Sequence, residues 1–187
     1  GGGPANLEAA RTLSRRGHTA VICEKESELG GSLRYASAAP FKKDLRSYLE
    51  WSIRMAERDS NIELRLDTEV DADYVQKENP DVLFIAVGAS PILPPFTASG
   101  TDRLLWAGDV LMNRKEAGEN VVIAGSGFTG LETALYLANE GHRVRVVDML
   151  PQSRIGADAP QMSMIGLKQL LAERGVEFMN EIRVEDV

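Results

Sequence analysis

Residues 121–148 read VVIAGSGFTGLETALYLANEGHRVRVVD, and this stretch decides the fold. A short apolar run over 121–124 predicts a strand, and a glycine-rich turn follows it. Apolar residues then recur at helical spacing over 128–140, which predicts a helix. Gly141 is expected to end this helix in the left-handed conformation. The β-branched residues after it predict a second strand that ends at Asp148.

The same design occurs a second time, at the beginning of the sequence. Residues 1–24 read GGGPANLEAARTLSRRGHTAVICE and match 125–148 at a constant offset of 124 positions. A helix ended by Gly17 and a strand over 20–23 are therefore expected. The strand that should precede Gly1 is not in this sequence, so we expect a piece of a longer protein, truncated at both ends.

Each glycine turn has the spacing of a pyrophosphate-binding loop. In the strand–GxGxxG–helix pattern, the first glycine permits a tight turn, the second lets the backbone approach the phosphates, and the third lets the helix pack closely on the strand. Free N–H groups at the helix start favour the negative charge. An acidic residue about 20 positions further on binds a ribose hydroxyl. Glu24 and Asp148 each lie 21 residues beyond the second glycine of their unit, so the sequence predicts two dinucleotide sites.

Two residues refine this interpretation. Asn6 stands where the third glycine of the first unit is expected, and its side chain either loosens the site or points outward. A first unit kept only as scaffold is the alternative. Asp148 would repel a 2′-phosphate and suits the free 2′-hydroxyl of NAD, which favours NAD over NADP. Glycine spacing alone does not separate a flavin from a nicotinamide dinucleotide.

The remaining segments continue an alternation of helices and strands. A helix is predicted over 41–58, a half-buried strand over 62–66, and a strand buried on both faces of a sheet over 81–87. A helix over 159–174 and a strand over 176–179 follow the second unit. We therefore predict an α/β fold with two Rossmann-like dinucleotide-binding units, the two-dinucleotide flavoprotein fold.

Composition excludes several classes of function. The chain of 187 residues has 21 Lys and Arg against 28 Asp and Glu, and its net charge of −7 favours neither nucleic acid nor anionic lipid as a partner. The single cysteine, Cys23, cannot form a disulfide framework, a zinc finger or a two-cysteine redox centre, and we expect a buried small apolar residue. No apolar run approaches ~18 residues. We expect a cytoplasmic protein that binds no nucleic acid, membrane or metal ion.

Several segments carry a family resemblance. GGGPANLEAA with EKESELGGSLRYAS resembles the flavin-binding start of the two-dinucleotide flavoprotein reductases, and PDVLFIAVGASP (80–91) is similar to their second flavin signature. Residues 125–148 resemble their inserted NAD(P) domain. APFKKDLRSYLEW is similar to the C-terminal part of the NADH:flavin oxidoreductases related to 2,4-dienoyl-CoA reductase and trimethylamine dehydrogenase. The resemblance implies a partial FAD-binding domain over 1–97 and a partial NAD-binding domain over 98–187, joined by the proline-rich linker at 90–100.

The resemblance also implies cofactors and the residues that touch them. NADH would reduce FAD, and electrons would pass to FMN and a 4Fe–4S cluster in a barrel domain outside this chain. Because the cofactors carry the hydride chemistry, no catalytic residue is expected here. The implied FAD-binding residues are Gly1, Gly3, Pro4, Ala5, Glu24, Lys25, Gly31, Ser32, Leu33, Val70, Val87, Gly88 and Ala89. The implied NAD(H)-binding residues are Gly125, Gly127, Phe128, Thr129, Gly130 and Asp148, with Phe128 either shielding the nicotinamide or packing.

Two alternatives stay open at this stage. In one, the first site holds only ADP and has no role in electron transfer, which Asn6 favours. In the other, the protein is a free-standing NADH oxidase or a ferredoxin-type reductase without the barrel. The sequence does not identify the final electron acceptor, and it is compatible with an oligomer.

Overall fold

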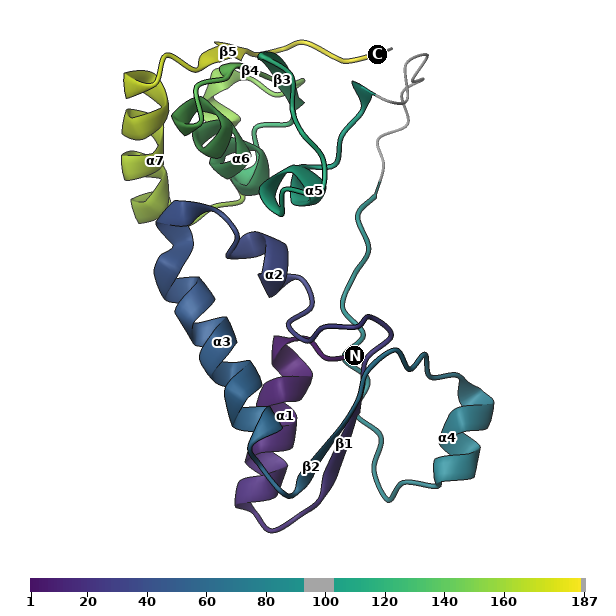
Figure 1. Ribbon diagram of the computed structural model, residues 1–187. Helices are drawn as coiled ribbons and strands as arrows, with labels where there is room; N and C mark the ends of the chain where they lie inside the picture. Colours follow the sequence, from purple (N-terminus) through teal and green to yellow (C-terminus); the bar gives the residue numbers. More distant parts are fainter. Residues whose placement is uncertain (93–102, 186–187) are drawn as a thin grey trace. The chain divides into compact units, whose positions relative to one another are not determined.

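The computed structural model describes residues 1–92 and 103–185, and the chain divides into two compact units, Gly1–Ile92 and Leu93–Val187 (Figure 1). Most of the predicted linker at 90–100, and the predicted boundary between residues 97 and 98, lie outside the described residues. The elements of the first unit are α1 Pro4–Arg15, β1 Ala20–Cys23, α2 Leu33–Ala36, η1 Pro40–Lys42, α3 Lys43–Glu57, β2 Ile62–Arg65 and α4 Ala72–Glu78. Those described in the second unit are α5 Ala107–Leu111, β3 Asn120–Ala124, α6 Phe128–Asn139, β4 Arg143–Val147, η3 Gln152–Arg154, α7 Gln161–Glu173 and β5 Glu177–Met179.

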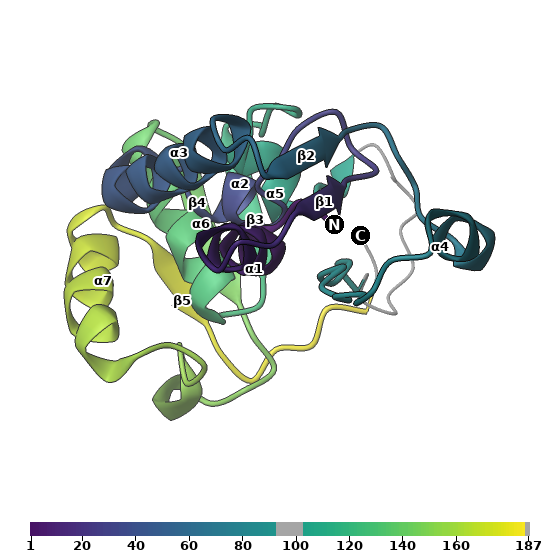
Figure 2. The ribbon, with the colours of Figure 1, turned by 90° about the horizontal axis from the view of Figure 1, so that it is seen from below.

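In the first unit, α1 and α3 pack on each other beside a parallel pair of strands (Figures 1 and 2). The pair β1–β2 begins with Ala20 opposite Ile62 and ends with Cys23 opposite Arg65. Because parallel strands need a crossover, the chain passes through α3 between them. The shared core consists of Leu7, Ala10, Ile22, Leu29, Ala56 and Ile62.

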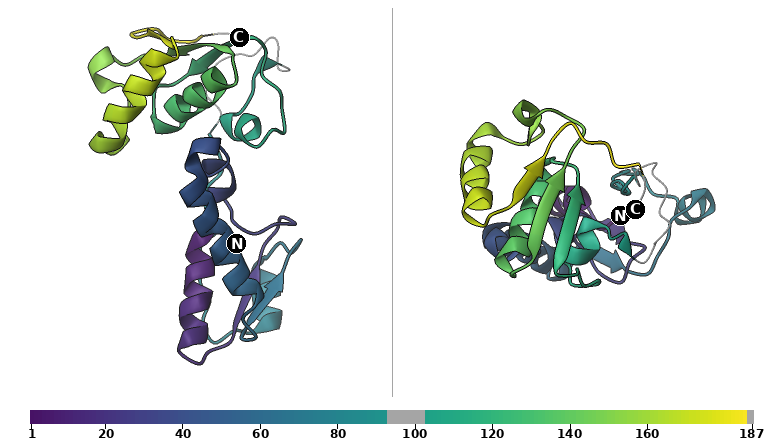
Figure 3. Two further views of the ribbon diagram at one scale, coloured as in Figure 1. Left: turned by 60° about the vertical axis from the view of Figure 1, so that its left-hand side comes forward. Right: turned by 90° about the horizontal axis from the view of Figure 1, so that it is seen from above.

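The second unit has a parallel sheet in the order β3–β4–β5 (Figure 3). Helix α6 connects β3 to β4 and packs on β4, while α7 connects β4 to β5 and packs on α6. Leu131, Ala134 and Leu171 are fully buried between these elements, with 0% of their surface exposed. The predicted α/β class with parallel sheets is thus confirmed.

Three helices are each followed by a glycine in the left-handed conformation, two of them at the predicted positions Gly17 and Gly141. Gly17, Gly141 and Gly175 follow α1, α6 and α7 with φ of +83°, +95° and +69°. Only glycine adopts this left-handed region without a steric cost from a Cβ. Each is followed within a few residues by the strand that the periodicity predicts.

The predicted strand over 81–87 is wrong. The segment forms no strand, and Ile85 and Val87 are 77% and 78% exposed. It passes beside the first glycine turn, since a Cβ built on Gly1 would lie 3.0 Å from the carbonyl oxygen of Ala86. Among the described residues, however, the sheet of this unit contains only β1 and β2. A continuous apolar run becomes a buried strand only where neighbouring strands accept its backbone hydrogen bonds, so sequence pattern alone did not suffice.

Candidate functional site: two glycine turns with returning acids

The glycine turn of the second unit joins the end of β3 to the start of α6. Gly125 has φ of +110°, and Gly127 is the residue immediately before the helix. A Cβ built on Gly130 would lie within 3.0 Å of the Gly125 carbonyl oxygen and 3.5 Å from Cγ2 of Ile123. The third glycine therefore lets the helix approach the strand, as the motif predicts. The first-turn N–H groups of α6 have no partner inside the helix and face the turn.

Asp148 follows β4 and reaches back to the middle of this turn. Its Oδ2 accepts hydrogen bonds from the backbone N–H and the hydroxyl of Ser126, both at 2.6 Å, and its Oδ1 accepts one from the Leu150 N–H at 2.8 Å. Burial raises the pKa of Asp148, but these donors outweigh burial and lower the pKa below its ordinary value. The carboxylate is thus ionised at neutral pH. It is half-buried, so part of its acceptor capacity stays accessible.

The first unit repeats this arrangement with Glu24, which is 7% exposed. Its Oε2 accepts a hydrogen bond from the Gly2 N–H, and its Oε1 accepts one from the Glu26 N–H at 2.9 Å. Burial raises the pKa of Glu24, but the backbone hydrogen bonds outweigh burial and lower it. Both predicted ribose-binding acids are therefore held as anions by the turn that precedes them.

The two units differ in how the same space is filled. A Cβ built on Gly2 would lie 2.5 Å from Cδ2 of Leu29 and 3.1 Å from Cβ of Glu24, so a larger residue there would force these side chains to shift. The second unit has Ser126 at that position and the shorter Asp148 as its acid. The serine hydroxyl takes the room that the longer glutamate side chain occupies in the first unit. The middle residue of the turn and the acid are thus matched in size.

The Asn6 side chain lies against the glycine turn rather than pointing outward. Its Nδ2 donates a hydrogen bond to the Gly1 carbonyl oxygen at 2.8 Å. Gly1 corresponds to Gly125, whose carbonyl oxygen is the atom that a side chain at Gly130 would meet. The asparagine therefore satisfies the oxygen that the third glycine leaves clear in the second unit. This contact argues against a decayed first unit.

A second loop lies against the first glycine turn. The Gly30 N–H donates to the Gly2 carbonyl oxygen at 2.8 Å, and a Cβ on Gly31 would lie 3.0 Å from Cα of Gly3. Gly31 has φ of +51°, so it needs to be glycine on two grounds. By contrast, Gly3 has ample room, since its nearest neighbour is 4.0 Å from an added Cβ.

The other predicted FAD-binding residues are placed as follows. Pro4 and Ala5 open α1 beside Gly3, and Ser32 and Leu33 open α2 beyond Gly31. Val87 lies near the turn, with its Cα 3.4 Å from a Cβ built on Gly1. The remaining predicted residues are exposed, namely Lys25, Val70, Gly88 and Ala89.

One residue that sequence reasoning missed lies directly on the second turn. Both carboxylate oxygens of Asp158 accept the backbone N–H of Phe128, at 3.0 and 3.1 Å. Phe128 is the first residue of α6. Asp158 thus caps the N-terminal end of α6, and no local sequence pattern indicates it, because it lies 30 residues away.

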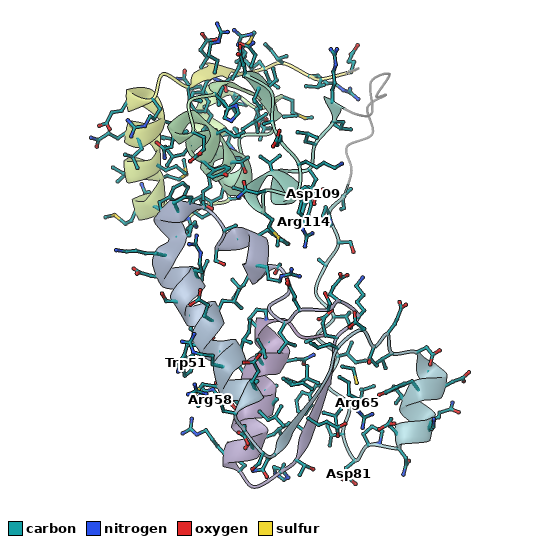
Figure 4. All side chains as sticks on the ribbon, in the orientation of Figure 1. Trp51, Arg58, Arg65, Asp81, Asp109 and Arg114 are labelled. Atoms are coloured by element: carbon teal, nitrogen blue, oxygen red, sulfur yellow. The ribbon has the colours of Figure 1, made fainter. Side chains whose placement is uncertain are left out.

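Cys23 is half-buried rather than fully buried, so the expectation of a simple apolar core residue was incomplete. Its thiol donates to the Tyr74 hydroxyl at 3.6 Å. Arg65 donates to the same hydroxyl and to Glu78, both at 2.7 Å, and Figure 4 shows its side chain on the side of the strands that faces α4. This network ties α4 to the strand pair. Within residues 1–92 and 103–185, no cluster of His, Cys, Asp or Glu is arranged to hold a metal ion, and no helix is long and apolar enough to span a membrane.

Two glycine turn–helix–strand units, each with a returning acid at the same offset, define a protein with paired dinucleotide-binding units. The chain belongs to the pyridine nucleotide-disulphide oxidoreductase family, which matches residues 1–187. Members of this family of oxidoreductases bind FAD and a nicotinamide dinucleotide. The two glycine turns, each with its acid, are of the type that binds such dinucleotides.

Individual relatives support this placement. The chain is 34% identical over 180 residues to an NADH oxidase of Thermoanaerobacter brockii, covering 94% of this chain and 27% of that protein. It is 37% identical over 149 residues to a cinnamate reductase of Clostridium sporogenes, covering 80% and 22%. A 2-naphthoyl-CoA reductase structure matches with a TM-score of 0.85 at 26% identity, covering 100% of this chain and 28% of that one. The chain thus spans about a quarter of the length of these relatives.

Proposed function

We propose that the first unit binds FAD and the second binds NAD(H), and that hydride passes from NADH to FAD. The observation that carries this proposal is the pair of acids, Glu24 and Asp148, each ionised and hydrogen-bonded to the middle of its glycine turn. An ionised acid at this position accepts hydrogen bonds from ribose hydroxyls and repels a 2′-phosphate. The second unit therefore prefers NADH to NADPH.

The chain's own residues act by binding and orientation. The N–H groups at the start of α6 hold the pyrophosphate, and the accessible acceptor positions of Asp148 hold the ribose. Gly3 leaves open the space through which a pyrophosphate approaches the first turn. When bound, NADH supplies a hydride that FAD accepts, so the chain needs no general acid or base for that step.

We further propose that this chain is the dinucleotide-binding part of an NADH:flavin oxidoreductase of the type that resembles 2,4-dienoyl-CoA reductase. Its relatives include reductases of cinnamate and of 2-naphthoyl-CoA, both with unsaturated groups beside a carboxyl or thioester. Those proteins are about four times as long as the match, which leaves room for a further domain. In this proposal that domain is a barrel that carries FMN and a 4Fe–4S cluster and receives electrons from FAD.

The cofactor content of the full-length protein tests the first site. We expect a visible flavin spectrum and, after denaturation, release of FAD. Release of ADP with no FAD would support a structural nucleotide site instead and overturn the proposed electron transfer. A colourless protein would also contradict the flavin assignment.

Gly3→Ala separates a ligand-binding role from a folding role. The added Cβ has room in the protein, so the fold should persist, but it narrows the approach of a pyrophosphate to the backbone. We expect loss of most bound FAD, with little difference in thermal stability when parent and variant are compared after removal of FAD. Gly118→Ala is the matched control, because nothing lies within 4 Å of its added Cβ. Full retention of FAD in Gly3→Ala would place the flavin elsewhere.

A further inference from the structure

The carboxylate of Asp158 occupies the position at which the second turn would bind phosphate. Its two oxygens lie 3.0 and 3.1 Å from the Phe128 nitrogen, and Oδ2 lies 3.1 Å from a Cβ built on Gly127. Gly127 is the second glycine of the motif and Phe128 is the first helical residue. At these two positions the backbone is expected to approach a pyrophosphate. An anionic side chain of the protein itself therefore satisfies this part of the helix N-terminus.

The Asp158 carboxylate belongs to a short loop, residues 155–159, that is hydrogen-bonded to the glycine turn. The Gly156 N–H donates to the Ser126 carbonyl oxygen at 2.9 Å, and the Ala159 N–H donates to the Gly156 carbonyl oxygen at 3.0 Å. Gly156 has φ of +68°, and Ile155 beside it is 8% exposed. The loop is therefore fastened to the glycine turn itself, two residues before Asp158. The aspartate can turn away while the anchor stays in place, because its contact with Phe128 is made by side-chain atoms and the anchor by backbone atoms.

Two anions cannot share the same donor. A pyrophosphate and the Asp158 carboxylate would compete for the Phe128 N–H, and at contact distance their like charges repel. The carboxylate must therefore leave before the pyrophosphate binds. It also returns when the ligand dissociates, because an acid stabilises a helix N-terminus.

We propose that Asp158 is a displaceable internal anion that competes with the pyrophosphate of NAD(H) and sets its affinity and release. This inference rests on the proposed function of the second unit. The apparent affinity of a ligand equals its intrinsic affinity multiplied by the fraction of sites that are open to it. The competing contact therefore weakens binding without touching the nicotinamide or the ribose. A weaker hold on the product speeds its exchange for a new NADH.

Calorimetric titration of NADH into the chain, with and without Asp158→Ala, tests the proposal. We expect the variant to bind NADH about fivefold more tightly, the factor that corresponds to a typical N-cap contact. It should also unfold at a lower temperature than the parent when no NADH is present. Asp158→Asn is a milder second variant for the case that Asp158→Ala folds poorly. It should change NADH affinity and unfolding temperature in the same directions as Asp158→Ala.

Asp71→Ala is the matched control. Asp71 caps α4 in the first unit by accepting the Tyr74 N–H at 2.8 Å, so its loss should lower stability and leave NADH affinity unchanged. Unchanged or weaker NADH binding in both Asp158 variants would overturn the competition while leaving the NAD(H) site intact. If neither the folded parent nor any variant bound NADH, the proposed function and the competition would both be refuted.

Discussion

Gly130→Ala should destabilise the second unit, although alanine is the better helix former. The added Cβ would lie within 3.0 Å of the Gly125 carbonyl oxygen, which belongs to the backbone and cannot rotate away. It would also contact Cγ2 of Ile123 at 3.5 Å, an ordinary packing distance. The start of α6 must therefore move away from the turn between Gly125 and Gly127.

The expected magnitude combines two opposing effects. Overpacking against a fixed backbone costs about 1–3 kcal/mol. Replacing glycine by alanine inside a helix contributes about 1 kcal/mol in the other direction. The net loss should be up to about 2 kcal/mol, which for a unit of this size corresponds to a fall of up to about 16 °C in its melting temperature.

Gly166→Ala provides the matched control, because Gly166 lies inside α7 and nothing is within 4 Å of its added Cβ. This substitution should stabilise the unit by about 0.4–1 kcal/mol. Circular dichroism during thermal and urea unfolding would measure both variants. If Gly130→Ala were stabilising to the same degree as Gly166→Ala, the argument that the third glycine is needed for helix–strand packing would be refuted.

The remaining predictions concern the acids and the asparagine of the two turns. Asp148→Asn should lower stability by about 1.5–3 kcal/mol, because buried Ser126 loses a charged acceptor, and it should weaken NADH binding; an unchanged urea midpoint would contradict this. The lowered pKa values of Glu24 and Asp148 mean that their contribution to stability is complete above ~pH 5 and is lost as the pH falls through those lowered values. Urea midpoints between ~pH 3 and ~pH 7 should therefore depend less on pH in Glu24→Gln with Asp148→Asn than in the parent, and parallel profiles would disprove the assignment. Asn6→Ala should lower the free energy of unfolding by about 0.5–1.5 kcal/mol, because the Gly1 carbonyl oxygen loses its donor. An unchanged free energy of unfolding would show that this hydrogen bond does not stabilise the turn.

Local patterns predicted most of the fold. The repeat of 1–24 in 125–148 indicated both turns, both first helices and the strands after them, and the structure has α1, β1, α6 and β4 there. These elements depend on neighbours in sequence: periodic apolar residues, a glycine that ends the helix, and β-branched residues after it. The acid at the fixed offset also needed only spacing to be found.

What could not be predicted depends on contacts between distant residues. The run over 81–87 looks like a buried strand, but whether it becomes one depends on neighbouring strands rather than on its own composition. Asp158 reaches Phe128 from another loop, so no motif marks it. The same holds for Asn6, whose contact with Gly1 is visible only once the turn is folded.

Anaerobic reduction of the full-length protein by NADH and by NADPH tests the central claim most directly. The two units are proposed to hold FAD and NADH, with Asp148 selecting the unphosphorylated ribose. Added NADH should bleach the flavin absorbance, and NADPH should require at least about tenfold higher concentration, a factor that corresponds to ~1.4 kcal/mol. Equal reduction by NADPH would contradict the role of Asp148, and a flavin that neither nucleotide reduces would contradict the account as a whole.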